Sequence, residues 1–262
     1  MTKVIVLTGG SSGIGQAAAK LLAEQGNLVY ELSRSGKDGE NIRHLTVDLA
    51  EEAEIARAFA RIGQEAGHID VLINNAAMGI AGPVELTGSP EARYLFDINF
   101  FGVFLCAKYA LPWLRAGGSG ARIINISSVA AVFALPYQAF YSAAKAAVSS
   151  LTLSLGNELQ GFGIQVAALL PGDVRTGFTA VRRKVGSGDS RYPGVEKAVD
   201  IMERDETGGV APEILAARIV QLVGKKRLKP FYCCGFKYQF FLFLGRVLPA
   251  SLANAIVRKM YS

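Results

Sequence analysis

The chain has 262 residues, half of them hydrophobic, which is enough to bury one large core in a single α/β domain. Its three cysteines, Cys106, Cys233 and Cys234, provide no disulfide framework, and its histidines, His44 and His68, stand apart from cysteine or carboxylate clusters. These features argue against a disulfide-stabilised scaffold. We expect no metal site and a reducing, cytoplasmic location.

The net charge of +6 is carried by one end of the chain. No Asp or Glu follows Glu213, whereas nine Lys or Arg residues do, so residues 1–213 carry a net charge of about −3 and the remainder about +9. This last part is apolar rather than densely basic, unlike a nucleic-acid-binding surface. We therefore expect no nucleic acid among the partners.

Short apolar runs alternate with helical patterns, which is typical of βαβ units and a parallel sheet. The runs are rich in Val, Ile and Leu, as strands buried on both faces are. The predicted strands are Val4–Leu7, Leu28–Leu32, Leu45–Val47, Val71–Ile73, Arg122–Ile126, Ile164–Leu170 and Leu228–Cys233, the last an edge or irregular strand because it contains Pro230. The predicted helices are Ile14–Glu24, Ala53–Ala66, Ala92–Leu111, Tyr141–Leu159 and Glu213–Val223.

No targeting or membrane-spanning segment is expected. The run Val4–Leu7 begins almost at once and is too short for a signal peptide. No stretch approaches the roughly 18 uninterrupted apolar residues that a membrane-spanning helix needs. Residues 177–210 are rich in Gly and charge with weak periodicity, which predicts a mobile insertion before the last helix.

A glycine-rich turn, Thr8-Gly9-Gly10-Ser11-Ser12-Gly13-Ile14-Gly15, joins the first strand to the first helix. Glycines permit a tight turn and let backbone N–H groups approach a pyrophosphate, and the helix N-terminus adds partial positive charge. The spacing of Gly9, Gly13 and Gly15 departs from the commoner GxGxxG pattern. Its place at the first strand–helix junction favours a nucleotide site over a bare turn.

The residues after the second strand bear on which dinucleotide would bind. NAD sites usually place an acidic residue here to hold the ribose 2′-hydroxyl. This chain has Ser33 and Arg34, a small hydroxyl and a guanidinium, which suit the 2′-phosphate of NADP. Glu31 is the rival that would favour NAD if it faced the ribose, but strand alternation is expected to turn it away. The cofactor prediction is NADP(H), with NAD(H) as the alternative.

Several further motifs occur in the order found in short-chain dehydrogenases/reductases, which the chain resembles from residue 3 to about 178. They are Thr8–Gly15, Asn74-Asn75-Ala76-Ala77, Asn99, Ser128, Tyr141-Ser142-Ala143-Ala144-Lys145 and Pro171-Gly172-Asp173-Val174-Arg175-Thr176. One departure is Ala76-Ala77, where the family usually has Ala-Gly. The resemblance implies a single-domain doubly wound Rossmann fold, with a mostly parallel seven-stranded sheet and helices on both faces.

The resemblance also implies catalytic roles. Tyr141 would be the proton donor or acceptor, Lys145 its partner one helical turn on, Ser128 the group that binds the substrate oxygen, and Asn99 the anchor of a water linking Lys145 to solvent. A free tyrosine has a pKa of about 10, and a nearby ammonium and an oxidised nicotinamide would lower it. The alternatives are a surface Tyr–Lys pair and a structural asparagine.

The cofactor contacts implied by the resemblance extend along the whole sheet edge. Asp48 would accept from the adenine amino group, or alternatively begin the following helix as an N-cap. Asn74 would stabilise the sheet. The predicted contacts are Gly9, Ser11, Ser12, Gly13, Ile14, Gly15, Ser33, Arg34, Asp48, Leu49, Asn75, Ala76, Tyr141, Lys145, Pro171, Gly172, Val174 and Thr176.

The C-terminal extension, residues 231–262, combines aromatic and basic residues. One interpretation is a last strand followed by a substrate lid or subunit contact, and the other is a segment resting on anionic lipid. With 177–210 as a substrate loop, this aromatic surface favours a hydrophobic ketone or alcohol, of the steroid, retinoid or lipid kind. The family resemblance further implies a homodimer or homotetramer packed through the helices containing Asn99 and Tyr141.

Two other classes of function stay open. An NADP-binding sensor without turnover is disfavoured by the intact Ser128, Tyr141 and Lys145. A membrane-surface lipid-binding protein rests on the C-terminal extension alone. Sugar-nucleotide epimerases share the sheet, but usually carry a larger substrate domain, for which this chain has no room.

Overall fold

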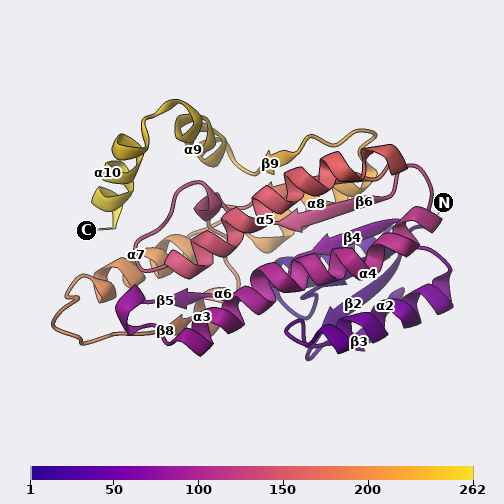
Figure 1. Ribbon diagram of the computed structural model, residues 1–262, viewed down its shortest axis with the longest axis horizontal. Coiled ribbons are helices and arrows are strands. Elements are labelled where there is room, and N and C mark those ends of the chain that lie inside the picture. The colour runs from indigo at the N-terminus through magenta and orange to yellow at the C-terminus, as the bar shows by residue number, and fades with distance from the viewer. Residues whose placement is uncertain (1, 262) are drawn as a thin grey trace.

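The fold is built on a sheet of seven strands, all of them parallel, in the order β3-β2-β1-β4-β6-β7-β9 (Figure 1). The computed structural model describes residues 2–261, with every side chain in that range except those of Phe236 and Arg246. The strands are β1 Val4–Thr8, β2 Leu28–Ser33, β3 Ile42–Thr46, β4 Val71–Asn74, β6 Arg122–Ile126, β7 Gln165–Leu170 and β9 Phe231–Cys233. The predicted single-domain α/β fold is confirmed, and each of the seven predicted strands overlaps an observed one.

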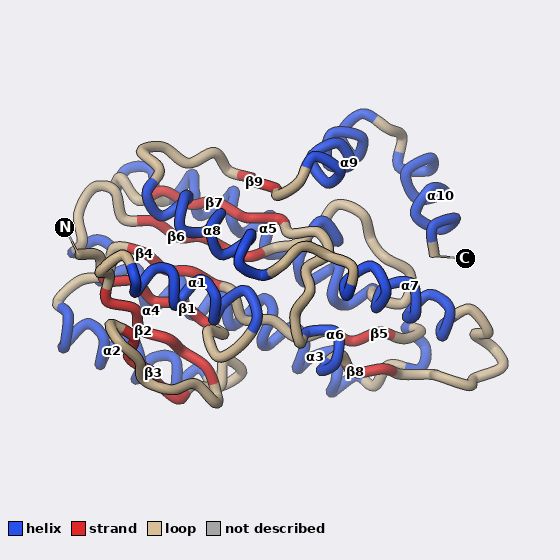
Figure 2. The backbone as a smooth tube through the Cα atoms, turned by 180° about the vertical axis from the view of Figure 1, so that it is seen from behind, coloured by secondary structure: helices blue, strands red, loops and turns tan. Residues whose placement is uncertain are grey.

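Two layers of helices cover the sheet, and the alternation of side chains along each strand divides the core between them. Val4 and Val6 of β1 join the core under one layer, whereas Ile5 and Leu7 join the core under the other. Figure 1 shows α4 and α5 crossing the near face, and Figure 2 shows α1 and α8 on the opposite face. The covering helices are α1 Gly13–Glu24, α2 Glu52–Ala66, α4 Gly102–Ala116, α5 Ala139–Glu158 and α8 Pro212–Gly224.

The predicted helix Ala92–Leu111 is part of a longer helical run. Helix α3, Ser89–Phe96, leads into a π-helical turn, Asp97–Phe101, which continues as α4. The run Ser89–Ala116 has 28 residues, and an 18-residue window within it has a mean hydropathy of 1.3, so by length and composition alone it could span a membrane. Buried residues of α4 pack into the sheet core, however, so this run has the place of a core helix.

Residues 177–210, predicted to be a mobile insertion with weak periodicity, contain helices and a strand, and their mobility stays a prediction. The segment contains α6 Phe178–Val181, β8 Arg183–Lys184 and α7 Val195–Thr207. Strand β8 pairs with β5, Ile80–Ala81, in a second, two-stranded sheet. Helix α7 buries Val195, Ala198, Val199 and Met202, an i, i+3, i+4, i+7 stripe that the surrounding charges obscure in the sequence.

The C-terminal extension was predicted to begin with the last strand, after a last helix at Glu213–Val223. The strand is present as β9, at the edge of the sheet, but two more helices follow it, α9 Phe236–Val247 and α10 Ala250–Met260. Both project beyond the sheet and its covering helices in Figure 1. The predicted extension is described as far as Tyr261, and Ser262 lies outside the described residues.

Candidate active site

The glycine-rich turn forms a cradle for a phosphate, built on glycine positions where a side chain would clash or would strain the backbone. Gly9 and Gly13 have positive φ values of 71° and 55°, which favour glycine. A Cβ at Gly15 would lie 2.2 Å from the Gly9 carbonyl oxygen, and one at Gly9 would lie 2.8 Å from the Ala76 Cα. The Asn75 side-chain amide donates to the carbonyl oxygens of Thr8 and Gly9, both at 3.1 Å. The turn is thereby held against the end of β4, with its backbone open to a phosphate.

This turn borders a cavity of about 560 Å³ at the carboxyl ends of the strands. The strand order reverses between β1 and β4, which is where ligands bind in doubly wound sheets. Of the eighteen predicted cofactor contacts, all except Gly15 line the cavity, and Gly15 lies behind the turn in contact with Gly9. A glycine cradle for phosphates at one end and Tyr141 and Lys145 at the other fit an extended dinucleotide.

Glu31 lies beneath the glycine-rich turn, held by three partners. Its carboxylate accepts from the Gly10 backbone N–H at 2.8 Å and from the Ser33 hydroxyl at 3.1 Å, and its Oε2 lies 2.6 Å from His44 Nδ1. Glu31 and Ser33 share one face of β2, because residues two apart on a strand point to the same side. The carboxylate is nevertheless absent from the cavity lining, since it is engaged with these groups.

Arg34 and Asp48 lie on the lining at the far end of the cavity from Tyr141. The exposed Arg34 donates from Nη1 to the Tyr94 hydroxyl at 3.3 Å. Asp48 Oδ1 accepts from the Ala50 backbone N–H at 3.0 Å, whereas the residue that caps α2 is Glu51. Asp48 therefore stabilises the turn before α2 but is not its N-cap, so that alternative is wrong. It lines the cavity, and its predicted contact with the adenine amino group stays a prediction.

Ser128, Tyr141 and Lys145 meet at the other end of the cavity. Ser128 follows β6, and its Oγ accepts from the Ala130 N–H at 3.1 Å. Tyr141 and Lys145 lie one turn apart on α5, with the lysine Nζ 5.8 Å from the tyrosine ring centroid. Lys145 Nζ donates to the Ile126 carbonyl oxygen at 2.8 Å. The structure thus brings the three predicted catalytic residues together.

The acid–base properties of this set differ from the sequence prediction. Burial raises the pKa of Tyr141 to about 12, and a hydrogen bond with Ser128 opposes this shift. Burial also lowers the pKa of Lys145 to about 8. In the protein without a dinucleotide Lys145 does not contribute to this shift, and its Nζ donates to the Ile126 carbonyl oxygen. The predicted lowering by the ammonium together with an oxidised nicotinamide stays a prediction. A tyrosine that keeps its proton is suited to be a proton donor.

Asn99 has a different place from the other predicted catalytic residues. It lies in the π-helical turn, is fully buried and does not line the cavity. Its Oδ1 accepts from the Met78 N–H and its Nδ2 donates to the Met78 carbonyl oxygen, both at 2.8 Å. The side chain therefore fixes the backbone of Met78, which does line the cavity. Its predicted role as a water anchor stays a prediction.

Asn74, expected to stabilise the sheet, begins a buried chain of hydrogen bonds. Its Nδ2 donates to Asn125 Oδ1 at 2.8 Å, and Asn125 Nδ2 donates to Thr152 Oγ1 at 2.9 Å. The chain joins β4, β6 and α5, the helix that carries Tyr141. It therefore ties the catalytic helix to the centre of the sheet.

Several cavity residues lie in segments where the sequence offered no motif. Phe178, Val181 and Glu206 come from α6 and α7, and the Phe178 ring centroid lies 5.7 Å from that of Tyr141. Tyr238 of α9 covers Gly172, where a Cβ would lie 2.1 Å from its ring. The Asp173 N–H donates to the Tyr238 hydroxyl at 3.0 Å. The extension thus contacts the Pro171–Thr176 turn, which the aromatic content of the tail alone could not locate.

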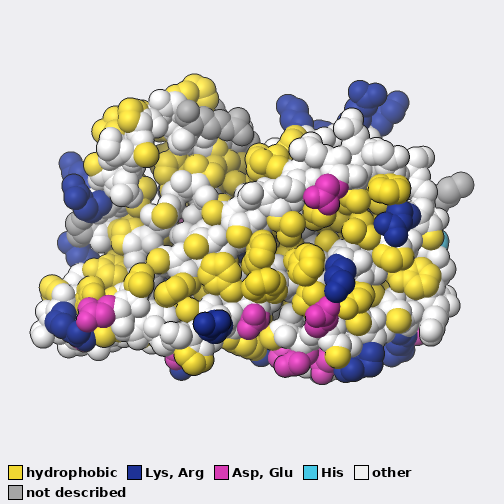
Figure 3. Space-filling model, in the orientation of Figure 1, with side chains coloured by type: hydrophobic (Ala, Val, Ile, Leu, Met, Phe, Trp, Pro, Cys, Tyr) yellow, Lys and Arg dark blue, Asp and Glu magenta, His cyan; other side chains and the backbone are white. Residues whose placement is uncertain are grey.

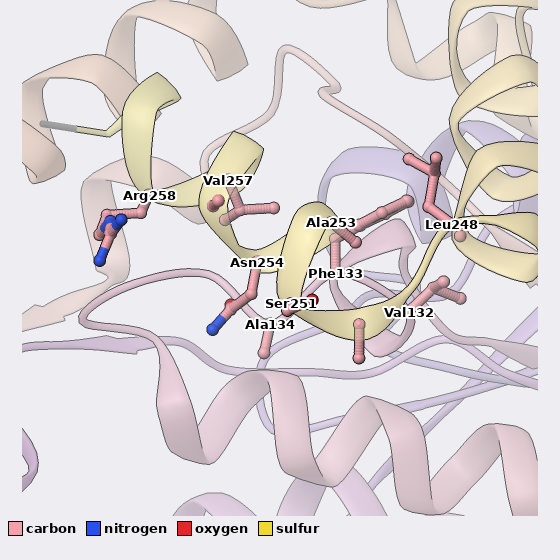
Figure 4. Close-up of a pocket in the computed structure, with 12 residues that line it drawn as sticks. Val132, Phe133, Ala134, Leu248, Ser251, Ala253, Asn254, Val257 and Arg258 are labelled. Atoms are coloured by element: carbon pink, nitrogen blue, oxygen red, sulfur yellow. The ribbon is translucent and has the colours of Figure 1, made fainter.

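A second cavity, of about 540 Å³, lies between α10, the end of α9 and the segment that follows Ser128 (Figure 4). Its lining is mostly apolar, and Val132, Phe133 and Leu248 project into this region. The same segment supplies Val129 and Leu135 to the cofactor cavity. A single loop therefore separates the two cavities.

The doubly wound sheet and the cavity at its switch point define a Rossmann-fold oxidoreductase. The chain belongs to the short-chain dehydrogenase/reductase family, because the family model described as short chain dehydrogenase matches residues 3–185. The predicted family and fold are confirmed. The predicted cofactor class, a nicotinamide dinucleotide, is confirmed by the family and fits the cradle.

Individual relatives extend this comparison over nearly the whole chain. The chain is 40% identical over 230 residues to 3-ketodihydrosphingosine reductase of Bacteroides thetaiotaomicron, which covers 86% of this chain and 84% of that protein. A short-chain dehydrogenase of Streptomyces avermitilis matches with a TM-score of 0.84 and 26% identity, over 98% of this chain and 95% of its own. A short chain dehydrogenase of Burkholderia cenocepacia, solved in complex with NADP, matches with a TM-score of 0.76 and 25% identity, over 96% and 95%.

Proposed function

We propose that the protein is an NADP(H)-dependent oxidoreductase that interconverts a hydrophobic, lipid-like ketone and its secondary alcohol. The observation that carries the proposal is the meeting of Ser128, Tyr141 and Lys145 on the cavity that the glycine-rich turn borders. This places a proton donor and a hydrogen-bonding hydroxyl beside the space for a dinucleotide. The bound dinucleotide supplies or accepts the hydride.

In the reducing direction the chain's own residues supply the proton that the ketone oxygen receives. The Tyr141 hydroxyl donates its proton to the ketone oxygen. It carries this proton at neutral pH because burial raises its pKa. Ser128 hydrogen-bonds the same oxygen and orients it. Lys145 is still mainly protonated at pH 7, because its pKa of about 8 lies above that value. It can therefore return a proton toward Tyr141 after the transfer.

Two features support NADP(H) as the preferred dinucleotide. Arg34 is the cation on the lining after β2, and its guanidinium can pair with a 2′-phosphate. Glu31, the acid that would favour NAD, is occupied by Gly10, Ser33 and His44. The Burkholderia cenocepacia structure in complex with NADP is consistent with this choice.

The substrate class follows from the apolar surroundings and from one relative. The Phe178 ring lies beside Tyr141, Val181 lines the same cavity, and the second cavity adds further apolar surface. The relative from Bacteroides thetaiotaomicron is a reductase of 3-ketodihydrosphingosine, a long-chain ketone. Among the steroid, retinoid and lipid ketones expected from the sequence, we therefore propose the long-chain lipid kind.

The test is oxidation of NADPH, followed at its absorbance, in the presence of long-chain ketones. We expect turnover with these ketones and a loss of about 10²- to 10⁴-fold in kcat in Tyr141→Phe, with NADPH binding unchanged. An NADP-binding sensor would bind NADPH and reduce none of the long-chain, steroid or retinoid ketones. That outcome would overturn the proposed enzyme.

The two C-terminal helices favour contact with a membrane surface as a second property. Helix α9 exposes Phe240, Phe243 and Val247 at i, i+3 and i+7, and α10 exposes an equally regular stripe, Leu252, Ile256 and Met260. With only basic charges after Glu213, these stripes fit an anionic bilayer. We propose a cytoplasmic protein in peripheral contact with such a membrane.

Flotation with phosphatidylserine-containing vesicles tests this contact. The double variant Phe243→Glu, Ile256→Glu is expected to lose binding, whereas Val84→Glu, at an exposed apolar position elsewhere, is expected to bind like the original protein. Equal binding by the double variant would exclude docking through these helices. Binding that does not depend on anionic lipid would exclude the electrostatic part of the argument.

The expected homo-oligomer also has a surface to support it. Phe101 of the π-helical turn, Phe104 of α4 and Leu153 of α5 are exposed. Figure 3 shows apolar side chains gathered over the face that these helices form. We propose that a second copy packs here, as a dimer or tetramer. Light scattering on Phe104→Glu is expected to show dissociation, and an unchanged mass would exclude this interface.

A further inference from the structure

A polar cluster lies at the wall of the cofactor cavity. The Glu206 carboxylate of α7 accepts from Arg182 Nη2 at one oxygen and from the Thr179 hydroxyl at the other. The Arg182 side chain is 1% exposed and that of Glu206 is 17% exposed. Glu206 lines the cavity and Arg182 lies behind it. The ion pair therefore holds a carboxylate at the cavity wall.

The cluster is adjacent to the reacting end of the cavity. The Arg182 guanidinium lies 5.5 Å from the Phe178 ring centroid, and that ring lies 5.7 Å from the Tyr141 ring. The charges of Glu206 and Arg182 both act on the pKa of Tyr141, the first raising and the second lowering it. One aromatic ring thus separates the cluster from the proposed proton donor.

Packing alone does not account for these polar groups. Among the described residues, Arg182 Nε and Nη1 are buried without a hydrogen-bond partner. A buried guanidinium that is only partly paired is unfavourable compared with apolar side chains of the same volume. A carboxylate has about four acceptor positions, and Thr179 and Arg182 use two of them. Glu206 therefore keeps acceptor capacity toward the cavity.

The surroundings of Glu206 favour a cation over a neutral donor. Asp173 also lines the cavity, and Asp205 precedes Glu206 on α7. After burial, the charges of Asp173, Asp205 and Glu206 together raise the pKa of Tyr261. Glu206 and Asp173 thus place two carboxylates on the lining of the same cavity.

We propose that Glu206, held by Arg182 and Thr179, binds an ammonium group that the substrate carries close to its ketone. The substrate class is then a long-chain amino ketone, with Asp173 on the same lining adding to the attraction. Glu206 acts on substrate choice and takes no part in the proton transfer. This inference rests on the proposed ketone reductase, whose Tyr141 fixes where the carbonyl must lie.

Three ketones of equal chain length test the original protein: an α-amino ketone, its N-acetyl derivative, and the ketone without nitrogen. We expect kcat/KM with NADPH to be about 10- to 100-fold higher for the free amine, the range of one charge-assisted hydrogen bond. Equal values for the three would overturn the role of Glu206 while leaving the ketone reductase in place. No turnover of any of them would overturn the reductase, and this inference with it.

The variant Glu206→Gln separates recognition from a structural role. Glutamine keeps the size and the hydrogen bonds to Thr179 or Arg182 but removes the charge. We expect the preference for the amine to vanish, so that the ratio of kcat/KM for the amine to kcat/KM for the ketone without nitrogen falls to about one. Glu196→Gln, an exposed acid on the same helix, is the matched control and keeps the preference.

A purely structural Glu206 would lower kcat/KM for all three ketones by the same factor, and this result would contradict the proposal. If Glu206→Gln does not fold, Glu206→Asp provides the measurement. Aspartate keeps the charge on a shorter side chain. The ratio of kcat/KM for the amine to kcat/KM for the ketone without nitrogen is therefore expected to fall while remaining above one. An unchanged preference in Glu206→Asp would overturn the proposal.

Discussion

Replacing Arg34 by alanine tests how the protein distinguishes NADPH from NADH. Arg34 lines the cavity just after β2 and is exposed, with one hydrogen bond to the Tyr94 hydroxyl at 3.3 Å. Glu31, the acid that would favour NADH, is occupied beneath the glycine-rich turn. A guanidinium in this position has the 2′-phosphate as its natural partner.

The expected magnitude follows from one charge-assisted hydrogen bond at an exposed position. Such a bond, fully formed, corresponds to about 10- to 150-fold in affinity. Solvent screens an exposed pair, so Arg34→Ala is expected to lower kcat/KM for NADPH by about 10- to 30-fold. The value for NADH should change by less than about twofold, since NADH lacks the phosphate.

The assay compares kcat/KM for the two dinucleotides with one ketone at low and at high salt. Raising the salt concentration should lower kcat/KM for NADPH more in the original protein than in Arg34→Ala, because salt screens the pair of Arg34 and the 2′-phosphate. Arg43→Ala is the control. Arg43 is another exposed arginine, but it pairs with Glu65 at 2.9 Å and lies outside the cavity. An equal loss for NADPH and NADH, or the same loss in Arg43→Ala, would refute the reasoning.

Three further changes test the site and its support. In the protein without cofactor, the unfolded state holds the Lys145 proton up to a pKa of 10.5 and the folded state only up to about 8, so stability rises with pH in this window. The free energy of unfolding in urea is measured for the original protein and for Lys145→Met, and the difference between the two should increase by about 2 kcal/mol from pH 8 to pH 10. A difference that does not change with pH would contradict the shifted pKa. Gly15→Ala places a Cβ 2.2 Å from the Gly9 carbonyl oxygen, so titration with NADPH should show a loss of about tenfold or more, and normal affinity would argue against the cradle. Asn125→Leu leaves the Asn74 amide without its partner in the core and should lower stability by about 2–3 kcal/mol in urea unfolding, whereas a neutral result would show that water replaces the bond.

The parallel sheet and most of the cavity could be predicted because their signals are local. A run such as Val4–Leu7 followed by a glycine-rich turn constrains strand, turn and helix at once. The edge position of β9 could also be predicted, since Pro230 has no N–H to donate to a neighbouring strand. Side chains that follow parallel strands gather at one edge of the sheet, which is why seventeen of eighteen predicted contacts share one cavity.

What could not be predicted depends on contacts between distant segments. The partner of Glu206 is Arg182, 24 residues away, and no spacing rule connects them. The high pKa of Tyr141 arises from burial, which a sequence does not display, whereas the i, i+4 spacing of Lys145 is visible and suggested the opposite direction. Helix α7 was missed because its charges hide a short apolar stripe, which only the packing of Val195 and Met202 reveals.

The π-helical turn at Asp97–Phe101 constrains how this region of the chain can change in length. A π-turn closes its hydrogen bond one residue later than an α-turn, so it holds one residue more. Removing that residue would leave an ordinary helix but rotate one side of it by about 100° against the other. Asn99 could then no longer face Met78 while α4 kept its core side buried. Single-residue deletions here should therefore be tolerated far less than in the exposed loops of the same protein.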